Sequence, residues 1–213
     1  MIHAYDKSYL SNAQKNLACM LDYLVNELDN PIEDAWEWFL GSKAAIQFEQ
    51  GDCSVIAGKS GIELAYAVLE DAGKEKPDTI QMLPYNRSRE YWTGWALAYY
   101  QWETGVPFSE IEEAIPVQEI CMLYEPYHEM DIRQLTDRLN ELYHEANPDT
   151  RLKTARVIAG LSQSELAEIS GVSVRTIQQY EQRQKNINKA QTEYLVMLAK
   201  ALSCTVEDLL EYV

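Results

Sequence analysis

The chain has 213 residues, of which 46% are hydrophobic, and it carries a formal net charge of −16 at pH 7. The hydrophobic content excludes a disordered chain, and the length suits one large domain or two modest ones. No stretch approaches the roughly 18 uninterrupted apolar residues of a membrane span, and the opening residues lack the pattern of a secretory signal. We therefore expect a cytoplasmic protein that has no membrane partner.

The charge is distributed unevenly along the chain. Residues 151–213 carry eight basic and seven acidic side chains, a net charge of +1. Residues 1–150 carry 10 basic and 27 acidic side chains, a net charge of −17, together with all five tryptophans. This difference predicts two domains with different functions: an acidic, aromatic-rich helical domain over residues 1–147 and a second domain over residues 151–213.

The sequence contains few motifs of the kinds found in catalytic, metal-binding or nucleotide-binding sites. The four cysteines and three histidines are scattered without metal-ligand spacing, so we expect neither a metal site nor a cofactor. The stretch CSVIAGKSG ends like a phosphate loop, but Cys53 stands where that loop requires its first glycine. No Ser/His/Asp or Cys/His arrangement stands out, and we do not expect an enzyme.

Most segments of the first domain have hydrophobic residues at helical spacing and capping residues at the expected helix ends. We expect Ser8 or Ser11 to cap the first helix, and Ser88 and Asp131 to cap two later helices, because their side chains accept hydrogen bonds from free helix N–H groups. No segment alternates as a half-buried strand does, so the sequence predicts an all-α fold. The expected helices cover residues 10–28, 31–50, 62–73, 89–105, 109–114, 116–124 and 132–146, and a loop covers residues 74–86.

The second domain contains five short predicted helices, of which the second and third have the spacing of a helix-turn-helix. Ala167 is small where the two helices cross, and Gly171 occupies the turn, where a positive φ is cheap only without a Cβ. Ser162 and Ser173 stand at N-cap positions. The predicted helices cover residues 150–159, 163–169, 174–182, 189–202 and 206–212, and the inward-facing residues are Leu166, Val172, Ile177 and Tyr180.

Residues 152–212, and above all the stretch GLSQSELAEISGVSVRTIQQYE, resemble the Cro and phage-repressor type of helix-turn-helix domain, often called XRE-like. The resemblance implies a five-helix, lambda-repressor-like DNA-binding domain and a sequence-specific transcriptional repressor. In this family the third helix enters the major groove of double-stranded operator DNA, and dimers span two half-sites. A homodimer is therefore a further expectation.

The resemblance assigns the reading of DNA bases to the exposed face of the third helix. The guanidinium fork of Arg175 suits guanine O6 and N7, Gln179 suits adenine, and Val174 suits a thymine methyl group. The complete set carried over from the family is Val174, Arg175, Thr176, Gln178 and Gln179.

The resemblance also assigns contacts with DNA phosphates. Gln163 matches a position that the family uses for phosphate, at the positive end of the second helix. Arg156 and Glu181 correspond to an ion pair between the first and third helices, with a solvated Arg156 near phosphate as the alternative. The loop after Glu181 reads QRQKN, where many relatives have glycine. The phosphate candidates are Gln163, Ser173, Arg183, Lys185, Asn186 and Lys189.

An aromatic stripe runs along the predicted helix over residues 89–105. Its residues recur at three- and four-residue steps, which is typical of the buried face of a core helix. Tyr91 and Tyr100 lie toward other faces, which predicts that some aromatic surface stays available to a partner. Whether the stripe is core or interface stays open, and the partner-binding candidates are Tyr91, Trp92, Trp95 and Tyr100.

A second resemblance concerns the first domain. The stretches AQKNLACMLDYLVNEL, SGIELAYAVLED and YWTGWALAYYQWETGVPFSEI are similar to helical domains fused to XRE modules in bacterial toxin–antitoxin operons. This resemblance implies an antitoxin that neutralises a cognate toxin and represses the shared operon. The alternative is an XRE-type repressor that is unrelated to a toxin and whose first domain senses a ligand or dimerises.

Overall fold

The structure is a computed structural model that describes residues 3–77 and 87–211, and this part of the chain contains helices and turns but no strand. The predicted all-α fold is confirmed. The chain divides into two compact units, Met1–Ala146 and Asn147–Val213, so the division falls at the start of the NPDT stretch. Each unit has a hydrophobic core of its own.

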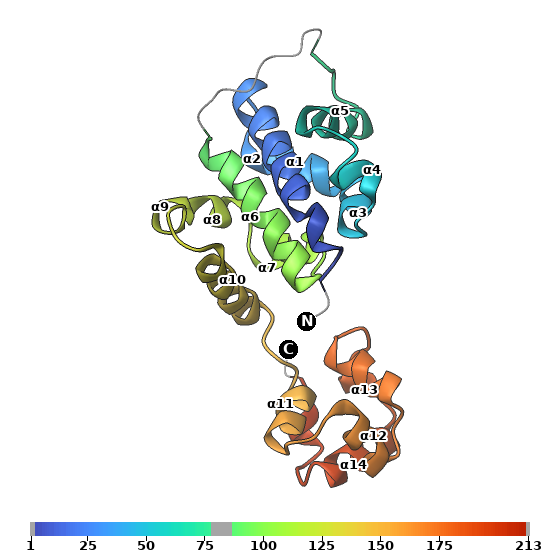
Figure 1. Cartoon of the computed structure of the whole chain (residues 1–213). Coiled ribbons are helices and arrows are strands. Elements are labelled where there is room, and N and C mark those ends of the chain that lie inside the picture. The colour runs from blue at the N-terminus through green and yellow to red at the C-terminus, as the bar shows by residue number, and fades with distance from the viewer. Residues whose placement is uncertain (1–2, 78–86, 212–213) are drawn as a thin grey trace. The chain divides into compact units, whose positions relative to one another are not determined.

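The N-terminal unit is built around one closely packed pair of helices, α1 (Leu10–Asp22) and α6 (Arg89–Thr104), which lie side by side in Figure 1. Gly94 permits the close approach, because a Cβ at this position would lie 2.7 Å from the carbonyl oxygen of Leu17. Further helices surround this pair: α2 (Ile32–Leu40), α3 (Lys43–Glu49), α4 (Cys53–Ile56), α5 (Gly61–Asp71), α7 (Phe108–Ala114), α8 (Val117–Met122), α9 (Tyr124–Tyr127) and α10 (Ile132–Ala146).

An aromatic cluster fills part of this core. Trp36 contacts Phe39 and Phe108 at centroid distances of 5.0 and 5.5 Å, and Phe39 contacts Phe48 at 6.3 Å. All four side chains are at most 1% exposed. Stacked and edge-to-face ring packing, both present here, stabilises a core beyond the area that it buries. The cluster joins the consecutive helices α2 and α3 to α7, which is distant from them along the chain.

The first two helices predicted for the N-terminal unit differ from those in the structure. The first helix is not capped by Ser8 or Ser11, because it continues directly from a 3-10 turn, Lys7–Tyr9, that Asp6 caps. The single helix expected over residues 31–50 is two helices, because Ser42 is extended and its buried side chain caps a new start. Ser88 and Asp131 do accept the expected hydrogen bonds, from the N–H groups of Tyr91 and Arg133.

The C-terminal unit consists of four α-helices and two 3-10 turns among the described residues. The fourth predicted helix begins three residues late, because residues 187–189 form a separate turn that Asn186 caps. The fifth predicted helix is one turn, and residues 212–213 lie outside the described chain. The helices are α11 (Arg151–Ile158), α12 (Gln163–Ser170), α13 (Val174–Glu181) and α14 (Thr192–Ala201), and the turns are Ile187–Lys189 and Glu207–Leu209.

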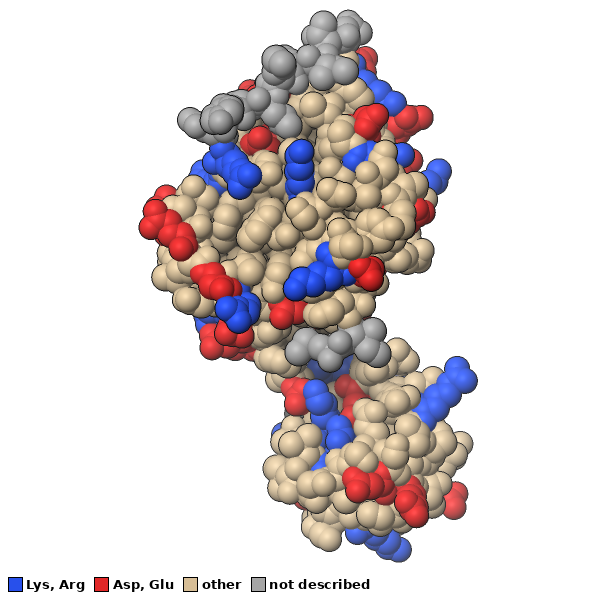
Figure 2. All heavy atoms as spheres, in the orientation of Figure 1, with Lys and Arg blue, Asp and Glu red and all other residues tan. Residues whose placement is uncertain are grey.

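Figure 2 shows basic and acidic side chains interspersed on the visible surface of each unit. In the described chain, no helix combines the length and apolar character needed to cross a bilayer. Nor do the described residues bring three or more histidine, cysteine or carboxylate side chains together in an arrangement that suits a metal ion. The predicted loop over residues 74–86 lies mostly outside the described residues.

Candidate DNA interface and aromatic surface

Three serine or threonine caps set the starts of α11, α12 and α13. Thr150 accepts a hydrogen bond from the N–H of Lys153, and Ser173 accepts one from the N–H of Thr176, each at 3.2 Å. Ser162 and Glu165 form a reciprocal capping box. Such caps satisfy N–H groups that otherwise lack a partner at the start of a helix. The predicted caps at Ser162 and Ser173 are therefore confirmed.

Gly171 ends α12 and forms the turn that aims α13. Its φ is +76°, and an added Cβ would lie 3.1 Å from the Cε atom of Met197. Both the backbone conformation and the available space therefore favour glycine. The residues expected to face inward are all buried, which fixes the angle between the two helices: Leu166, Val172, Ile177 and Tyr180.

The predicted ion pair between the first and third helices is present. The Nε atom of Arg156 donates to Oε1 of Glu181 at 2.7 Å, and its Nη2 atom donates to Oε2 at 3.0 Å. The side chains are 11% and 2% exposed, respectively. Arg156 also donates to the carbonyl oxygen of Leu161 at 2.7 Å. This bidentate geometry supports the structural role of Arg156 rather than a solvated one near phosphate.

Glu181 also holds Gln163 at the start of α12. The Nε2 atom of Gln163 donates to Oε2 of Glu181 at 2.7 Å, and its Oε1 atom accepts a hydrogen bond from Nε2 of Gln178 at 3.3 Å. The side chain of Gln178 therefore points toward the start of α12. The amide of Gln163 retains one N–H that these contacts leave available.

The recognition helix α13 carries only two charged residues, Arg175 and Glu181. Glu181 is buried in the ion pair with Arg156. Arg175 is exposed, and it makes no ion pair within the described chain. Val174, Thr176, Gln178 and Gln179 are half-buried. The accessible face of α13 therefore presents one free cation among polar and apolar side chains.

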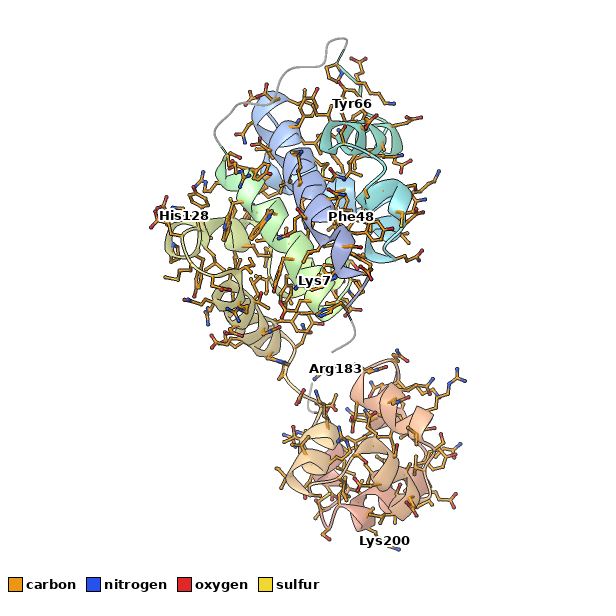
Figure 3. The ribbon with its side chains drawn as sticks, viewed as in Figure 1. Lys7, Phe48, Tyr66, His128, Arg183 and Lys200 are labelled. Atoms are coloured by element: carbon orange, nitrogen blue, oxygen red, sulfur yellow. The ribbon has the colours of Figure 1, made fainter. Side chains whose placement is uncertain are left out.

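The loop that follows α13 places the remaining phosphate candidates. Arg183, labelled in Figure 3, has a φ of +56°, in the left-handed region that favours glycine. Its Nη1 atom donates to the carbonyl oxygen of Pro148 at 3.0 Å, so a phosphate contact requires this hydrogen bond to open. Lys185 and Lys189 are exposed, and Asn186 caps the next turn through its side chain.

The aromatic candidates of the N-terminal unit divide into two groups. Tyr100 is 1% exposed, and its hydroxyl donates to Oδ1 of Asn140 at 3.0 Å, so the prediction that it offers partner-binding surface is wrong. Helix α6 is covered by α1 and also by the chain after residue 105. Among the residues of α6, only Arg89 is exposed. Tyr91, Trp92 and Trp95 are half-buried and line one pocket.

Sequence reasoning missed the other side of this pocket, which Tyr124, Tyr127 and His128 supply. Tyr124 and Tyr127 belong to α9, a helix of four residues, and His128 is its C-cap. The letters YEPYH concentrate aromatic residues around a proline, and this concentration was the available signal. A helix this short shows no periodicity that would assign its side chains to a face.

The short capped helices, the glycine turn and the buried residues between α12 and α13 form a helix-turn-helix. The model of the helix-turn-helix family matches residues 152–209, which confirms the XRE-like resemblance of the C-terminal unit. Proteins of this family are DNA-binding transcriptional regulators, and the match supports that function for this chain. The match does not extend to residues 1–147, whose resemblance to antitoxin domains stays a prediction. No curated protein and no solved structure matches the chain.

Proposed function

We propose that the chain is a sequence-specific repressor that reads operator bases through α13. The observation that carries this proposal is the exposed Arg175 on a helix whose one carboxylate is buried against Arg156. A free guanidinium near the start of a recognition helix suits the two acceptors on the major-groove edge of guanine. Gln179, Val174, Thr176 and Gln178 complete the proposed reading surface.

Phosphate contacts position this helix in our proposal. Gln163 is the first residue of α12, where backbone N–H groups and the free amide N–H face an anion favourably. Ser173 caps α13, Asn186 caps the turn Ile187–Lys189, and Lys185 and Lys189 add exposed positive charge. Arg183 joins this set when it leaves Pro148. A homodimer places two such modules on two half-sites.

We further propose that the N-terminal unit binds and neutralises a toxin encoded by a neighbouring gene, and that the chain represses their shared operon. The net charge of −17 over residues 1–150 disfavours DNA as the partner of this unit and favours a basic protein. Half-exposed aromatic side chains are the type of residue that anchors protein interfaces. The resemblance to antitoxin domains agrees with both features.

A second candidate function is a repressor whose N-terminal unit senses a small molecule. The observation in its favour is the pocket that Tyr91, Trp92 and Trp95 line, which has a volume of about 250 Å³. Pockets for drug-sized ligands are usually larger, roughly 300–1,000 Å³. This pocket is therefore small for such a ligand, and the acidic charge of the N-terminal unit is our reason to favour the protein partner.

Co-expression separates the two functions. The tagged full chain and the product of the adjacent gene are produced together, and the complex is isolated on the tag. We expect the product to co-purify with the wild type and with Arg175→Ala, because α13 has no part in this contact. We also expect the product alone to stop growth and the chain to restore it. A product that neither co-purifies nor inhibits growth would exclude the antitoxin function.

A further inference from the structure

A small pocket opens between the start of α6 and the segment over residues 124–132. Its volume is about 250 Å³. Six aromatic side chains line it, with Ser88, Met130 and Ile132 between them. Figure 3 labels one of the lining residues, His128, at the end of α9. The six aromatic residues, here called the aromatic pocket, are Tyr91, Trp92, Trp95, Tyr124, Tyr127 and His128.

The rings of the aromatic pocket hold one another in place. Trp92 and Tyr124 meet edge to face at a centroid distance of 5.6 Å. Tyr124 stacks on His128 at 4.3 Å with 17° between the planes, and the Nδ1 atom of His128 lies 2.9 Å from the carbonyl oxygen of Tyr124. Ring surfaces fixed in this way lose little conformational freedom when a guest binds.

The chain itself places a cation on one of these rings. The guanidinium carbon of Arg87 lies 5.3 Å from the ring centroid of Tyr91, within the distance of a cation–π contact. Arg87 lines the same pocket. The aromatic pocket therefore already accepts a guanidinium at its edge, and Trp92, Trp95 and Tyr127 offer further ring surface.

One wall of the pocket belongs to an acidic segment, although among the described residues no carboxylate lines the pocket itself and Arg87 is the one lysine or arginine that does. The segment over residues 124–132 contains three carboxylates and neither lysine nor arginine. Asp131 pairs with Arg133, whereas Glu125 is exposed and Oε1 of Glu129 lies 3.7 Å from Nε2 of His128. The side chain of Glu129 is 87% exposed. Figure 2 shows acidic side chains where Figure 1 draws α9.

We propose that the aromatic pocket receives an arginine side chain of a basic protein partner. The volume suits one large side chain rather than a drug-sized ligand. A planar guanidinium stacks on tryptophan and tyrosine faces, and arginine is among the residues that dominate interface energies. This inference rests on the proposed function in one respect only, namely that the N-terminal unit binds a protein.

The first experiment measures binding of the isolated chemical group to the full chain. The probe is N-acetyl-arginine amide, and the control is N-acetyl-norleucine amide, which has a similar length and no charge. Indole N–H resonances of the five tryptophans report the site. We expect the arginine probe to shift Trp92 and Trp95 saturably at millimolar concentration and to leave buried Trp36 unchanged. Equal shifts with both probes, or no shift at Trp92 and Trp95, would overturn the proposal.

Two variants locate the site. Trp92→Leu removes a ring, and we expect at least a tenfold loss of affinity for the arginine probe. The double variant Glu125→Gln, Glu129→Gln changes only exposed charges, so it keeps the fold testable if Trp92→Leu fails to fold, and we expect a loss of about threefold. The matched control is Glu70→Gln on α5. An unchanged affinity in the double variant contradicts the proposed attraction.

The second experiment separates this inference from the antitoxin function. Co-purification of the neighbouring gene product is repeated with the double variant and with Trp92→Leu. Loss of the product with these variants, but not with Glu70→Gln, supports the pocket as the contact. A product that co-purifies equally with all variants leaves the antitoxin function standing and removes the pocket from it. If the arginine probe binds but no gene product co-purifies, the pocket is supported as an arginine site and the antitoxin function is excluded.

Discussion

The two units hold their helices by different physical means. In the C-terminal unit, α11, α12 and α13 each begin at a serine or threonine cap, and a buried ion pair joins the first to the third. In the N-terminal unit, α3, α4, α5 and α6 also begin at side-chain caps, but no ion pair among its described residues has both partners buried, and aromatic packing and one close helix pair hold the core. The small unit therefore depends on a buried ion pair whose loss is severe, and the large unit depends on shape.

This difference can be tested unit by unit, because all five tryptophans lie in the N-terminal unit. Tryptophan fluorescence follows the unfolding of that unit alone. Amide resonances of residues 151–211 follow the C-terminal unit in the same sample. Each substitution below is expected to move one of these two signals.

The largest expected effect is that of Glu181→Ala. The change leaves the guanidinium of Arg156 buried without its partner, and such losses cost about 3–5 kcal/mol. We expect the C-terminal unit to unfold at a much lower temperature while tryptophan fluorescence is unchanged. Glu168→Ala, which removes an exposed carboxylate from α12, is the control. Equal unfolding temperatures for the two variants would show that the ion pair does not hold this unit.

The corresponding test of the N-terminal unit is Gly94→Ala. Replacing glycine inside an exposed helix usually stabilises it by about 1 kcal/mol. Here the added Cβ meets the carbonyl oxygen of Leu17 at 2.7 Å, and overpacking of this kind costs about 1–3 kcal/mol, so we expect net destabilisation. Gly41→Ala is the control, since its nearest neighbour lies at 3.5 Å. A stabilised Gly94→Ala variant, measured by tryptophan fluorescence, would contradict the close packing of α1 and α6.

The smallest expected effect concerns the pH dependence of stability. Burial raises the pKa of Glu112, although the N–H of Val117 donates to it at 2.8 Å. A raised pKa in the folded state means that this group favours folding below its unfolded pKa and that the benefit is lost as the pH rises through the folded pKa. Glu112→Gln keeps the acceptor for Val117, so we expect it to stabilise the N-terminal unit at pH 7 by less than about 1 kcal/mol, since water screens the half-exposed group.

The C-terminal unit is expected to show the opposite sign at Glu165. Hydrogen bonds from Ser162 lower the pKa of this carboxyl, so its contribution is present above the unfolded pKa and is lost as the pH falls. Glu165→Gln should therefore destabilise the C-terminal unit at pH 7 and approach the wild type in acid. Thermal unfolding between pH 2 and pH 8 compares each variant with the wild type, and curves parallel to that of the wild type would refute the assignment.

The sequence predicted the features that depend on a few neighbouring residues. Ser162, Ser173 and Gly171 act within one turn of the chain, so their types and spacing specify the local geometry. The ion pair of Arg156 with Glu181 joins residues 25 apart and was predicted only through the family resemblance.

Features that depend on how many elements surround a helix were not predictable. Tyr100 lies off the main aromatic stripe, and only the packing of α10 against α6 at Asn140 shows why it is buried. The pocket residues on α9 gave no periodic signal. The break at Gly41 and Ser42 is set by a buried cap that one sequence does not distinguish from a continuing helix.

The most direct test of the account measures the affinity of the full chain for DNA from its own upstream region and for a scrambled duplex, at one fixed salt concentration. Arg175→Ala is compared with Lys200→Ala, which removes the same charge from α14, and Figure 3 shows Lys200 and Arg183 at opposite ends of the unit. We expect Arg175→Ala to lose about 1–3 kcal/mol on the upstream DNA and little on the scrambled duplex. Equal losses on both duplexes, or a loss no larger than that of Lys200→Ala, would contradict base reading by α13.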